Sequence, residues 1–321
     1  MPRFLLFLLL IVLALASIVS GILFGSANLP PEKVIESILG NASGLDAQIV
    51  LQLRLPRVLS AFACGGLLAL AGALLQVLLR NPLADPYILG ISGGAAVAAL
   101  GGMLMGLSWG GVNLLALTGA LAAIGLVFAL SYGGGFWDMR RLLLTGVVLS
   151  AGFGALISLM LVLAPTAQVQ GMLFWLMGDL SHAQNPAVVW GAMLFVAGFS
   201  LWQAQSLNIL SLGEIKAKTL GVSVMPLQIG IYFLAAVATS AAVMEAGAIG
   251  FIGLVIPHMV RLLGVSDYRW LIPMALLLGG GFLTVADTLA RTVVAPSQLP
   301  VGVLTALLGV PTLLMLLRKI R

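Results

Sequence analysis

Charged side chains are scarce in this chain, and three of them fall within five residues between two long apolar stretches. In LGEIKAKTLGV, residues 212–222, Glu214 and Lys218 are four residues apart with the glutamate leading. On a helix this spacing favours an ion pair worth about 0.2–0.5 kcal/mol. Taken alone, the segment favours a short solvated helix without a partner.

The other residues of this segment fit the same short helix. Leu212 and Ile215 share one face and Lys216 points elsewhere, while Gly213 and Gly221 bracket the turns. The segment therefore predicts a charged helix that also has an apolar face.

Few other side chains could do chemistry. His182 and His258 are far apart, and a lone histidine in such a setting is more often structural than a ligand. Cys64 is the single cysteine, which excludes an intrachain disulfide and a cysteine metal site. The chain also lacks the G-x-x-x-x-G-K-[ST] phosphate loop. We expect no enzyme, no metal site and no cofactor in this chain.

The composition places these residues in a membrane. The chain has 321 residues, of which 61% are hydrophobic and 8% charged, far below the charged fraction of about a quarter in soluble proteins. Apolar runs of about 20 residues, enough to cross a bilayer as a helix, recur along it. The ten runs are Phe4–Gly25, Leu55–Leu79, Tyr87–Leu107, Val112–Tyr132, Leu142–Ala164, Ala187–Gln203, Pro226–Met244, Ile249–Gly264, Leu271–Ala290 and Leu299–Leu317.

The first run has two interpretations. Arg3 followed by an apolar stretch could be a cleaved signal peptide, but Phe4–Gly25 exceeds the 7 to 15 residues of such a segment. We favour a retained first helix. The sequence thus predicts an all-α integral membrane protein with about ten transmembrane helices.

The basic residues orient the ten helices. With both termini in the cytoplasm, eleven of the fifteen lysines and arginines are cytoplasmic, and only Lys33, Arg54, Arg57 and Arg291 are outside. This distribution explains the net charge of +5 without a nucleic acid partner. The cytoplasmic residues are Arg3, Arg80, Arg140, Arg141, Lys216, Lys218, Arg261, Arg269, Arg318, Lys319 and Arg321.

Ion-coupled transport has little support, because coupling normally requires ionisable groups at mid-membrane. Glu245, Asp287 and Arg261 lie near helix ends, and the other polar residues within the runs are Gln76 and Gln228. A secondary transporter and a membrane scaffold without transport remain as rivals.

Four stretches together carry a family resemblance. They are RLPRVLSAFACGGLLALAGALLQ at 54–76, RNPLADPYILGISGGA at 80–95, LGEIKAKTLGV at 212–222, and the segments from GAIGFIGLVIPHMVR to ADTLARTVVAPSQLPVGVLTALLGVP across 247–311. In order and spacing they resemble the FecCD family, the permeases of type II ABC importers for iron chelates, haem and vitamin B12.

The resemblance implies a fold and a set of partners. It implies one permease domain over residues 1–321 with the type II ABC importer permease fold, in a bacterial inner membrane. The implied partners are a second copy of the chain, two ATPase subunits that hold ATP and Mg²⁺, a periplasmic binding protein and membrane lipid. Iron chelates, including haem, rank ahead of vitamin B12 as the substrate.

The resemblance also assigns roles to residues. The cytoplasmic loop at about 205–225 would contain the coupling helix that contacts the ATPase. Its implied contact residues are Leu212, Gly213, Glu214, Ile215, Lys216, Ala217, Lys218, Leu220 and Gly221. Arg54, Arg57 and Arg291 would dock the binding protein, with helix anchoring as the alternative, and Asp287 could hold Arg291 one turn away.

The pore would lie between two subunits, lined by small residues of the fifth and tenth helices. The implied residues are Gly154, Ser158, Gly302, Ala306 and Gly309, for which close helix packing is an equal alternative. Phe174, Trp175 and His182 near the mouth could touch a flat chelate.

Three interruptions of the apolar pattern complete the expectations. The prolines of RNPLADP, residues 80–86, predict a tight re-entry into the third helix. Gly171–Leu180 is too short to cross and predicts a short helix near the outer mouth. Pro257 predicts a break in the eighth helix.

Overall fold

The computed structural model describes the chain except for residues 1, 41–43, 134–135, 138, 184–185 and 320–321. Nearly all of the described chain is helical, with one two-stranded antiparallel pairing. The elements are α1 (Arg3–Leu23), α2 (Pro31–Ile38), α3 (Leu45–Gln48), the π-helix η1 (Ile49–Arg54), α4 (Leu55–Leu78), the 3₁₀ helix η2 (Pro86–Leu89), α5 (Ile91–Leu104), α6 (Trp109–Ser131), β1 (Tyr132–Gly133), β2 (Phe136–Trp137), α7 (Met139–Leu163), α8 (Thr166–Leu176), α9 (Ala187–Trp202), α10 (Ala204–Ser211), α11 (Glu214–Thr219), α12 (Val224–Ala246), α13 (Ile252–Leu262), α14 (Tyr268–Thr292) and α15 (Val301–Lys319).

The helices agree with the predicted membrane segments. Among the described residues, six helices are long and apolar enough to cross a membrane. α9 and α10 pass the same test only together, as a pair bent by 64° that is either a broken span or a re-entrant loop. Three shorter apolar helices, α5, α13 and α15, complete the set. Each of the ten predicted runs overlaps one of these helices, which confirms an all-helical membrane protein.

α4 is the central helix, and nearly all of its side chains are buried. It packs against α14, α12, α13 and α9. Glycines allow the close approaches: a Cβ at Gly65 would overlap the carbonyl oxygen of Gly279 on α14, and one at Gly72 would overlap that of Gly253 on α13. Without a hydrophobic driving force between helices in lipid, such close backbone contact supplies much of the packing energy.

We expect Gly72→Ala to destabilise the protein, because the added methyl group must push α4 away from the backbone of α13. Overpacking of this kind costs about 1–3 kcal/mol. The matched control is Gly125→Ala on α6, where an added Cβ meets no atom within 4 Å. Thermal unfolding in detergent should show a lower midpoint than wild type for Gly72→Ala and an unchanged midpoint for Gly125→Ala. Equal midpoints would contradict the close contact.

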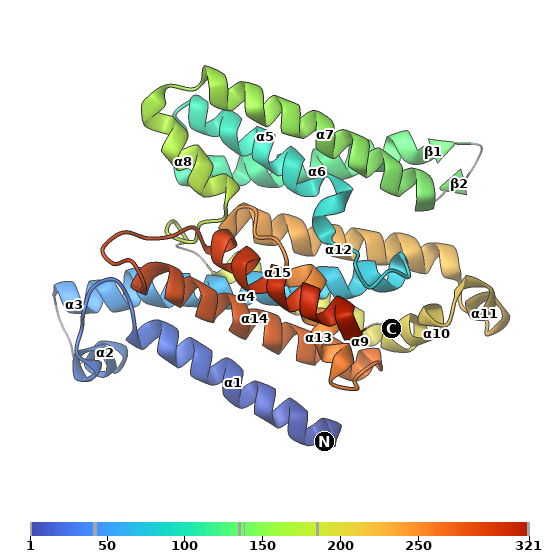
Figure 1. Ribbon diagram of the computed structural model, residues 1–321, viewed down its shortest axis with the longest axis horizontal. Coiled ribbons are helices and arrows are strands. Elements are labelled where there is room, and N and C mark those ends of the chain that lie inside the picture. The colour runs from blue at the N-terminus through green and yellow to red at the C-terminus, as the bar shows by residue number, and fades with distance from the viewer. Residues whose placement is uncertain (1, 41–43, 134–135, 138, 184–185, 320–321) are drawn as a thin grey trace.

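The helix bundle has two distinct ends. Figure 1 shows α10 and α11 at one end, with α2 and α3 at the other. Arg3 lies near Asp267, Asp267 bonds to Asn208 of α10, and Arg80 approaches Gly213. These residues, which the sequence places on one side of the membrane, therefore lie together at what we call the α11 end. The opposite end is called the α2 end.

Figure 1 also shows α5, α6, α7 and α8 gathered on one side of α12, with α4, α14 and α1 on the other. α1 packs along α14. The last carbonyls of α1 accept hydrogen bonds from Arg54 and Arg291. These contacts attach the end of α1 to η1 and α14.

The eighth predicted segment is interrupted, but not at its proline as expected. Pro257 lies inside α13, and the irregular backbone precedes the helix, at residues 247–251. There Gly247 has φ +66° and Phe251 has φ +71°, which is the left-handed region. The expected location of the break was wrong, because a neighbouring side chain compensates for the hydrogen bond that Pro257 cannot make.

Candidate functional site

The charged segment forms α11, a helix of six residues at one end of the bundle. Gly213 precedes it with φ +112° and Gly221 follows it with φ +81°, conformations that glycine adopts without strain. Lys218 Nζ and Glu214 Oε1 are 3.2 Å apart, which confirms the predicted ion pair. The backbone N–H of Val222 donates to the carbonyl of Ala217 at 3.0 Å and closes the C-terminal turn.

One face of α11 is buried and the other is apolar and exposed. Ala217 is fully buried, whereas Ile215 is 81% exposed and Leu212 is 59% exposed. Leu220 is likewise exposed. Two exposed leucines and an isoleucine beside an exposed ion pair form a small surface suited to another protein. We call Leu212, Ile215 and Leu220 the α11 apolar patch.

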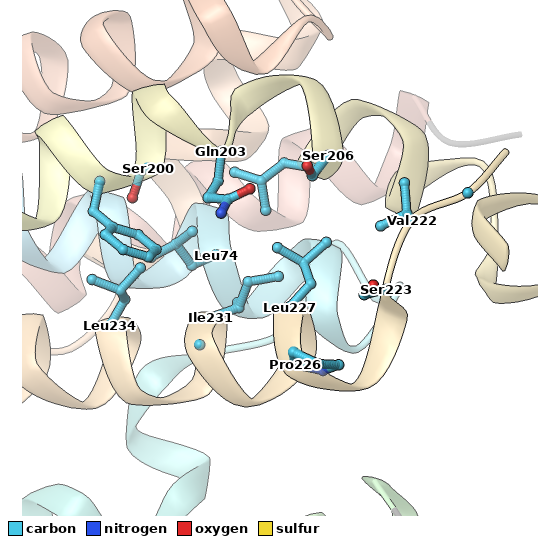
Figure 2. A pocket seen from close by; sticks show the side chains of 14 residues that line it. Leu74, Ser200, Gln203, Ser206, Val222, Ser223, Pro226, Leu227, Ile231 and Leu234 are labelled. Carbon is cyan, nitrogen blue, oxygen red and sulfur yellow. The ribbon is translucent and has the colours of Figure 1, made fainter.

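A cavity of about 350 Å³ lies beside this segment, between α9–α10 and the start of α12. Figure 2 shows Leu227, Ile231 and Leu234 on α12 facing Gln203 and Ser206 across it. The lining is mainly aliphatic. The cavity leaves the bent helix pair α9–α10 without close packing against this part of α12.

The loop after α4 makes the predicted tight re-entry. The side chain of Asn81 accepts a hydrogen bond from the N–H of Leu83 at 2.9 Å, and Asp85 accepts one from the N–H of Tyr87 at 2.8 Å. These turns and the 3₁₀ helix η2 bring the chain back into the bundle at α5. These hydrogen bonds account for the turn geometry of the loop without a ligand.

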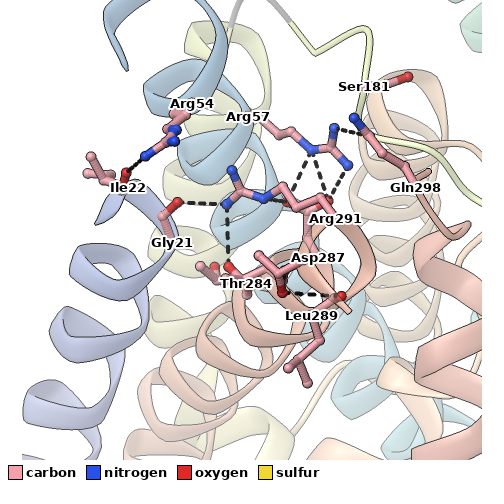
Figure 3. Close-up of polar contacts among 12 residues, drawn as sticks. Gly21, Ile22, Arg54, Arg57, Ser181, Thr284, Asp287, Leu289, Arg291 and Gln298 are labelled. Carbon is pink, nitrogen blue, oxygen red and sulfur yellow. Dashed lines mark hydrogen bonds and ion pairs between the residues drawn. The ribbon is translucent and has the colours of Figure 1, made fainter. Parts of the chain in front are cut away.

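At the α2 end, Arg54 is buried and holds the end of α1. Figure 3 shows its guanidinium directed at the carbonyl of Ile22. Its Nη1 donates to the carbonyls of Ile22 at 3.0 Å and Leu23 at 2.9 Å, and its Nη2 donates to the carbonyl of Ala27. Because the last carbonyls of a helix lack partners within it, this arginine supplies a C-terminal cap for α1.

Arg57 and Arg291 share one buried carboxylate, that of Asp287 (Figure 3). Arg57 donates from Nε to Oδ1 at 3.0 Å and from Nη2 to Oδ1 at 2.8 Å. Arg291 Nε lies 3.3 Å from Oδ2, the predicted pair one turn apart. Arg291 also donates to the carbonyl of Gly21 at 2.7 Å. The cluster joins α4, α14 and α1.

The burial of these arginines bears on their predicted docking role. Arg54, Arg57 and Arg291 are 4%, 8% and 3% exposed, and each donates hydrogen bonds within the chain. In this conformation they anchor helices, as the alternative expectation held, and present little guanidinium surface outward. The sequence analysis singled out the three arginines and Asp287. It did not single out Gln298, whose Oε1 accepts a hydrogen bond from Arg57 at 2.8 Å.

The small residues proposed for the pore fall into two groups. On α7, Gly154 and Ser158 are exposed, and the Ser158 hydroxyl donates to the Gly154 carbonyl at 3.0 Å. On α15, a Cβ at Gly302 would overlap the carbonyl of Met177, and Gly309 packs against Phe251. Ala306 is half-buried. Close packing therefore explains the two glycines of α15, whereas the α7 face is open.

Of the aromatic residues expected near the outer mouth, Trp175 is buried, Phe174 is half-buried and His182 is exposed. α8 begins at Thr166, somewhat earlier than the predicted short helix, and its Trp175 is buried. The imidazole of His182 stacks on Trp109 with ring centroids 3.7 Å apart. Burial, and to a lesser degree the charge of Arg57, lower the pKa of His182. The stacking on Trp109 supports a structural role for His182.

No group of three or more histidine, cysteine, aspartate or glutamate side chains suited to a metal ion occurs in the part of the chain that the structure describes. Glu245, noted as an ionisable group in a membrane segment, accepts a hydrogen bond from the Ser60 hydroxyl at 2.8 Å. The features that stand out are therefore the exposed α11 surface and the buried arginine cluster at opposite ends.

Comparison with known proteins identifies the family of this chain. The family model of the FecCD transport family matches residues 9–319, which is almost the whole chain. The chain belongs to the FecCD transport family. As a FecCD protein it is the permease of a type II ABC importer, an integral membrane transport subunit, and ATP hydrolysis belongs to a separate subunit in this family.

Relatives extend over the full length of this FecCD chain. The hemin transport system permease protein HmuU of Yersinia pestis is 40% identical over 332 residues, covering 100% of this chain and 97% of that protein. The cobalamin import system permease protein BtuC of Halobacterium salinarum is 41% identical over 281 residues, covering 85% and 74%. A solved metal-chelate-type ABC transporter in an inward-facing conformation superimposes with a TM-score of 0.84 at 30% identity, covering 99% of this chain and 100% of the solved one.

Proposed function

We propose that this permease works as a homodimer with two ATPase subunits and a periplasmic binding protein, and imports a metal chelate. The observation that carries the proposal is the α11 apolar patch beside the Glu214–Lys218 pair. Exposed apolar side chains on a short helix outside the membrane segments indicate a protein partner. ATP binding by that partner would move α11, and the two pore states would differ in their affinity for the partner.

The proposal assigns a side of the membrane to each end. The α11 end is cytoplasmic, with both termini inside and the chain in a bacterial inner membrane, as the basic residues predict. ATP and Mg²⁺ are held by the ATPase subunits, and this chain holds no cofactor. The binding protein docks at the α2 end, where direct contact with Arg54, Arg57 and Arg291 stays a prediction.

The proposed pore lies between two copies of the chain. Support comes from α7, whose outward residues are mostly exposed and include Gly154 and Ser158. A membrane helix that exposes a glycine and a serine is suited to face a second subunit rather than lipid alone. Gly302, Ala306 and Gly309 on α15 contribute the opposite wall in this proposal.

For the substrate we favour an iron chelate, including haem, over vitamin B12. The relative named for hemin transport matches the chain over its whole length, and the superimposable solved structure is of a metal-chelate-type transporter. The relative named for cobalamin import covers 85% of the chain and supports the alternative. Few polar groups line the described helices, so selectivity would reside mainly in the binding protein.

We expect uptake to require ATP hydrolysis by the partner. The permease is reconstituted in proteoliposomes with its ATPase and binding protein, and uptake of ferric siderophore, haem and cobalamin is measured with radiolabels. A variant ATPase that cannot hydrolyse ATP serves as the control and should abolish uptake. Uptake that survives in this control but collapses with the proton gradient would instead show a secondary transporter.

A further inference from the structure

A chain of hydrogen bonds connects the segment before α11 to the interior of the bundle. It starts at Asn208 on α10, three residues before that helix ends. Asn208 Nδ2 donates to Asp267 Oδ1 at 2.7 Å, and Asn208 Oδ1 accepts from the backbone N–H of Tyr268 at 2.9 Å. One amide thus holds both the N-cap residue and the first residue of α14. α10 is fixed to the start of α14 in a single orientation.

The second step leads from α14 through α13 to α4. Arg261 of α13 donates from Nη2 to the hydroxyl of Tyr268 at 3.1 Å. Its Nη1 donates to the Oε1 of Gln76 on α4. Gln76 and Tyr268 are each 3% exposed, so these bonds lie where little water competes. In such surroundings a hydrogen bond is stronger and an unmade one costs more.

The third step ends at the start of α13. Gln76 Nε2 donates to the carbonyls of Gly253 at 3.3 Å and Leu254 at 3.1 Å. Four residues after Gly253 stands Pro257, which has no N–H and leaves the Gly253 carbonyl without its helical donor. The Gln76 amide supplies the missing donor. This is why α13 continues through its proline, and why its first turn depends on a side chain of α4.

The first turn of α13 adjoins the proposed pore wall. Phe251 precedes the helix with φ +71°, a conformation that costs a residue with a side chain of order 1–3 kcal/mol. Its ring and Cβ pack against Gly309 of α15. A change at Gly253 would therefore reach α15 within a few residues.

We propose that Asn208, Arg261 and Gln76 are positioning residues. They carry movement of α10 and α11 to α13 and α15. This inference rests on the proposed function of α11 as the contact with the ATPase. Each link joins a different helix, so a shift of α10 could reach α13 through direct hydrogen bonds. None of the three residues needs to touch the substrate or the ATPase.

The test separates transport from ATP hydrolysis in proteoliposomes that contain permease, ATPase and binding protein. Asn208→Ala should leave ATPase association and hydrolysis in place and lower transport per ATP by about 2- to 30-fold, the range of typical coupling changes. Gln76→Glu keeps an acceptor for Arg261 but cannot donate to the α13 carbonyls, and should have the same effect. Gln205→Ala, an exposed amide on the same helix α10, is the matched control and should behave as wild type.

The double variant distinguishes a relay from independent structural effects. If Asn208 and Gln76 act in one relay, the double variant should lose little more coupling than either single variant. Additive losses, or single variants whose transport per ATP equals that of wild type, would overturn the relay. If the wild-type complex itself shows no ATP-dependent transport, the proposed function fails, and this outcome is distinct from failure of the relay alone.

Discussion

Asp287→Asn should strongly destabilise the permease, because it leaves the guanidinium groups of Arg57 and Arg291 buried without their counter-charge. Removing one partner of a buried ion pair costs about 3–5 kcal/mol. Asn has nearly the same shape as Asp, so the variant tests charge rather than volume. We expect a large fall in the thermal midpoint in detergent and a smaller yield of monodisperse protein.

A surface pair at the same end provides the control. Asp46 pairs with Lys33 at 2.6 Å where both side chains are partly or largely exposed, and Asp46→Asn should change the midpoint little. Equal shifts for the two variants would show that the buried cluster contributes no more than a surface pair. The combination of Asp287→Asn with Arg291→Gln should destabilise less than the sum of the two, since it also removes an uncompensated charge.

Glu214→Arg should uncouple transport without unfolding the protein. The pair with Lys218 is exposed, and its loss costs about 0.2–0.5 kcal/mol of helix stability. A charged group in a partner interface contributes more, about 1.5–3 kcal/mol, so transport should fall by about tenfold or more. The measurement is ATP-dependent uptake by the reconstituted complex, with Gln205→Arg as a control for added charge at this end.

A charge exchange separates two roles of this glutamate. Glu214→Arg together with Lys218→Glu restores the pair within α11 but reverses the charges that a partner meets. Recovery of transport would show that the two side chains matter only to each other. Continued loss would show that they reach across to the ATPase. Normal transport by Glu214→Arg alone would refute the docking assignment.

Much of this architecture follows from the sequence. Each of the ten apolar runs overlaps a helix in the described part of the chain, because a long apolar segment in a membrane satisfies its backbone hydrogen bonds as a helix. α11 was predictable because Glu214 and Lys218 have helical spacing between two glycines. The pairing of Asp287 with Arg291 followed from the same periodicity. All three features depend on local spacing, which a sequence displays directly.

Contacts between distant segments could not be predicted in this way. Arg57 and Asp287 are 230 positions apart, and nothing in either local sequence states that they meet in the interior. The docking role of the arginines came from the family resemblance, and their local sequence does not show that they are buried. Pro257 suggested a break, because the donor that compensates for it, Gln76, lies 177 positions from the carbonyl of Gly253.

The cavity beside the α9–α10 bend leaves room for this helix pair to move. In this structure a cavity of about 350 Å³ lies between α9–α10 and the start of α12. Space beside the bend lets α9 change its angle to α10 without displacing the residues of α12.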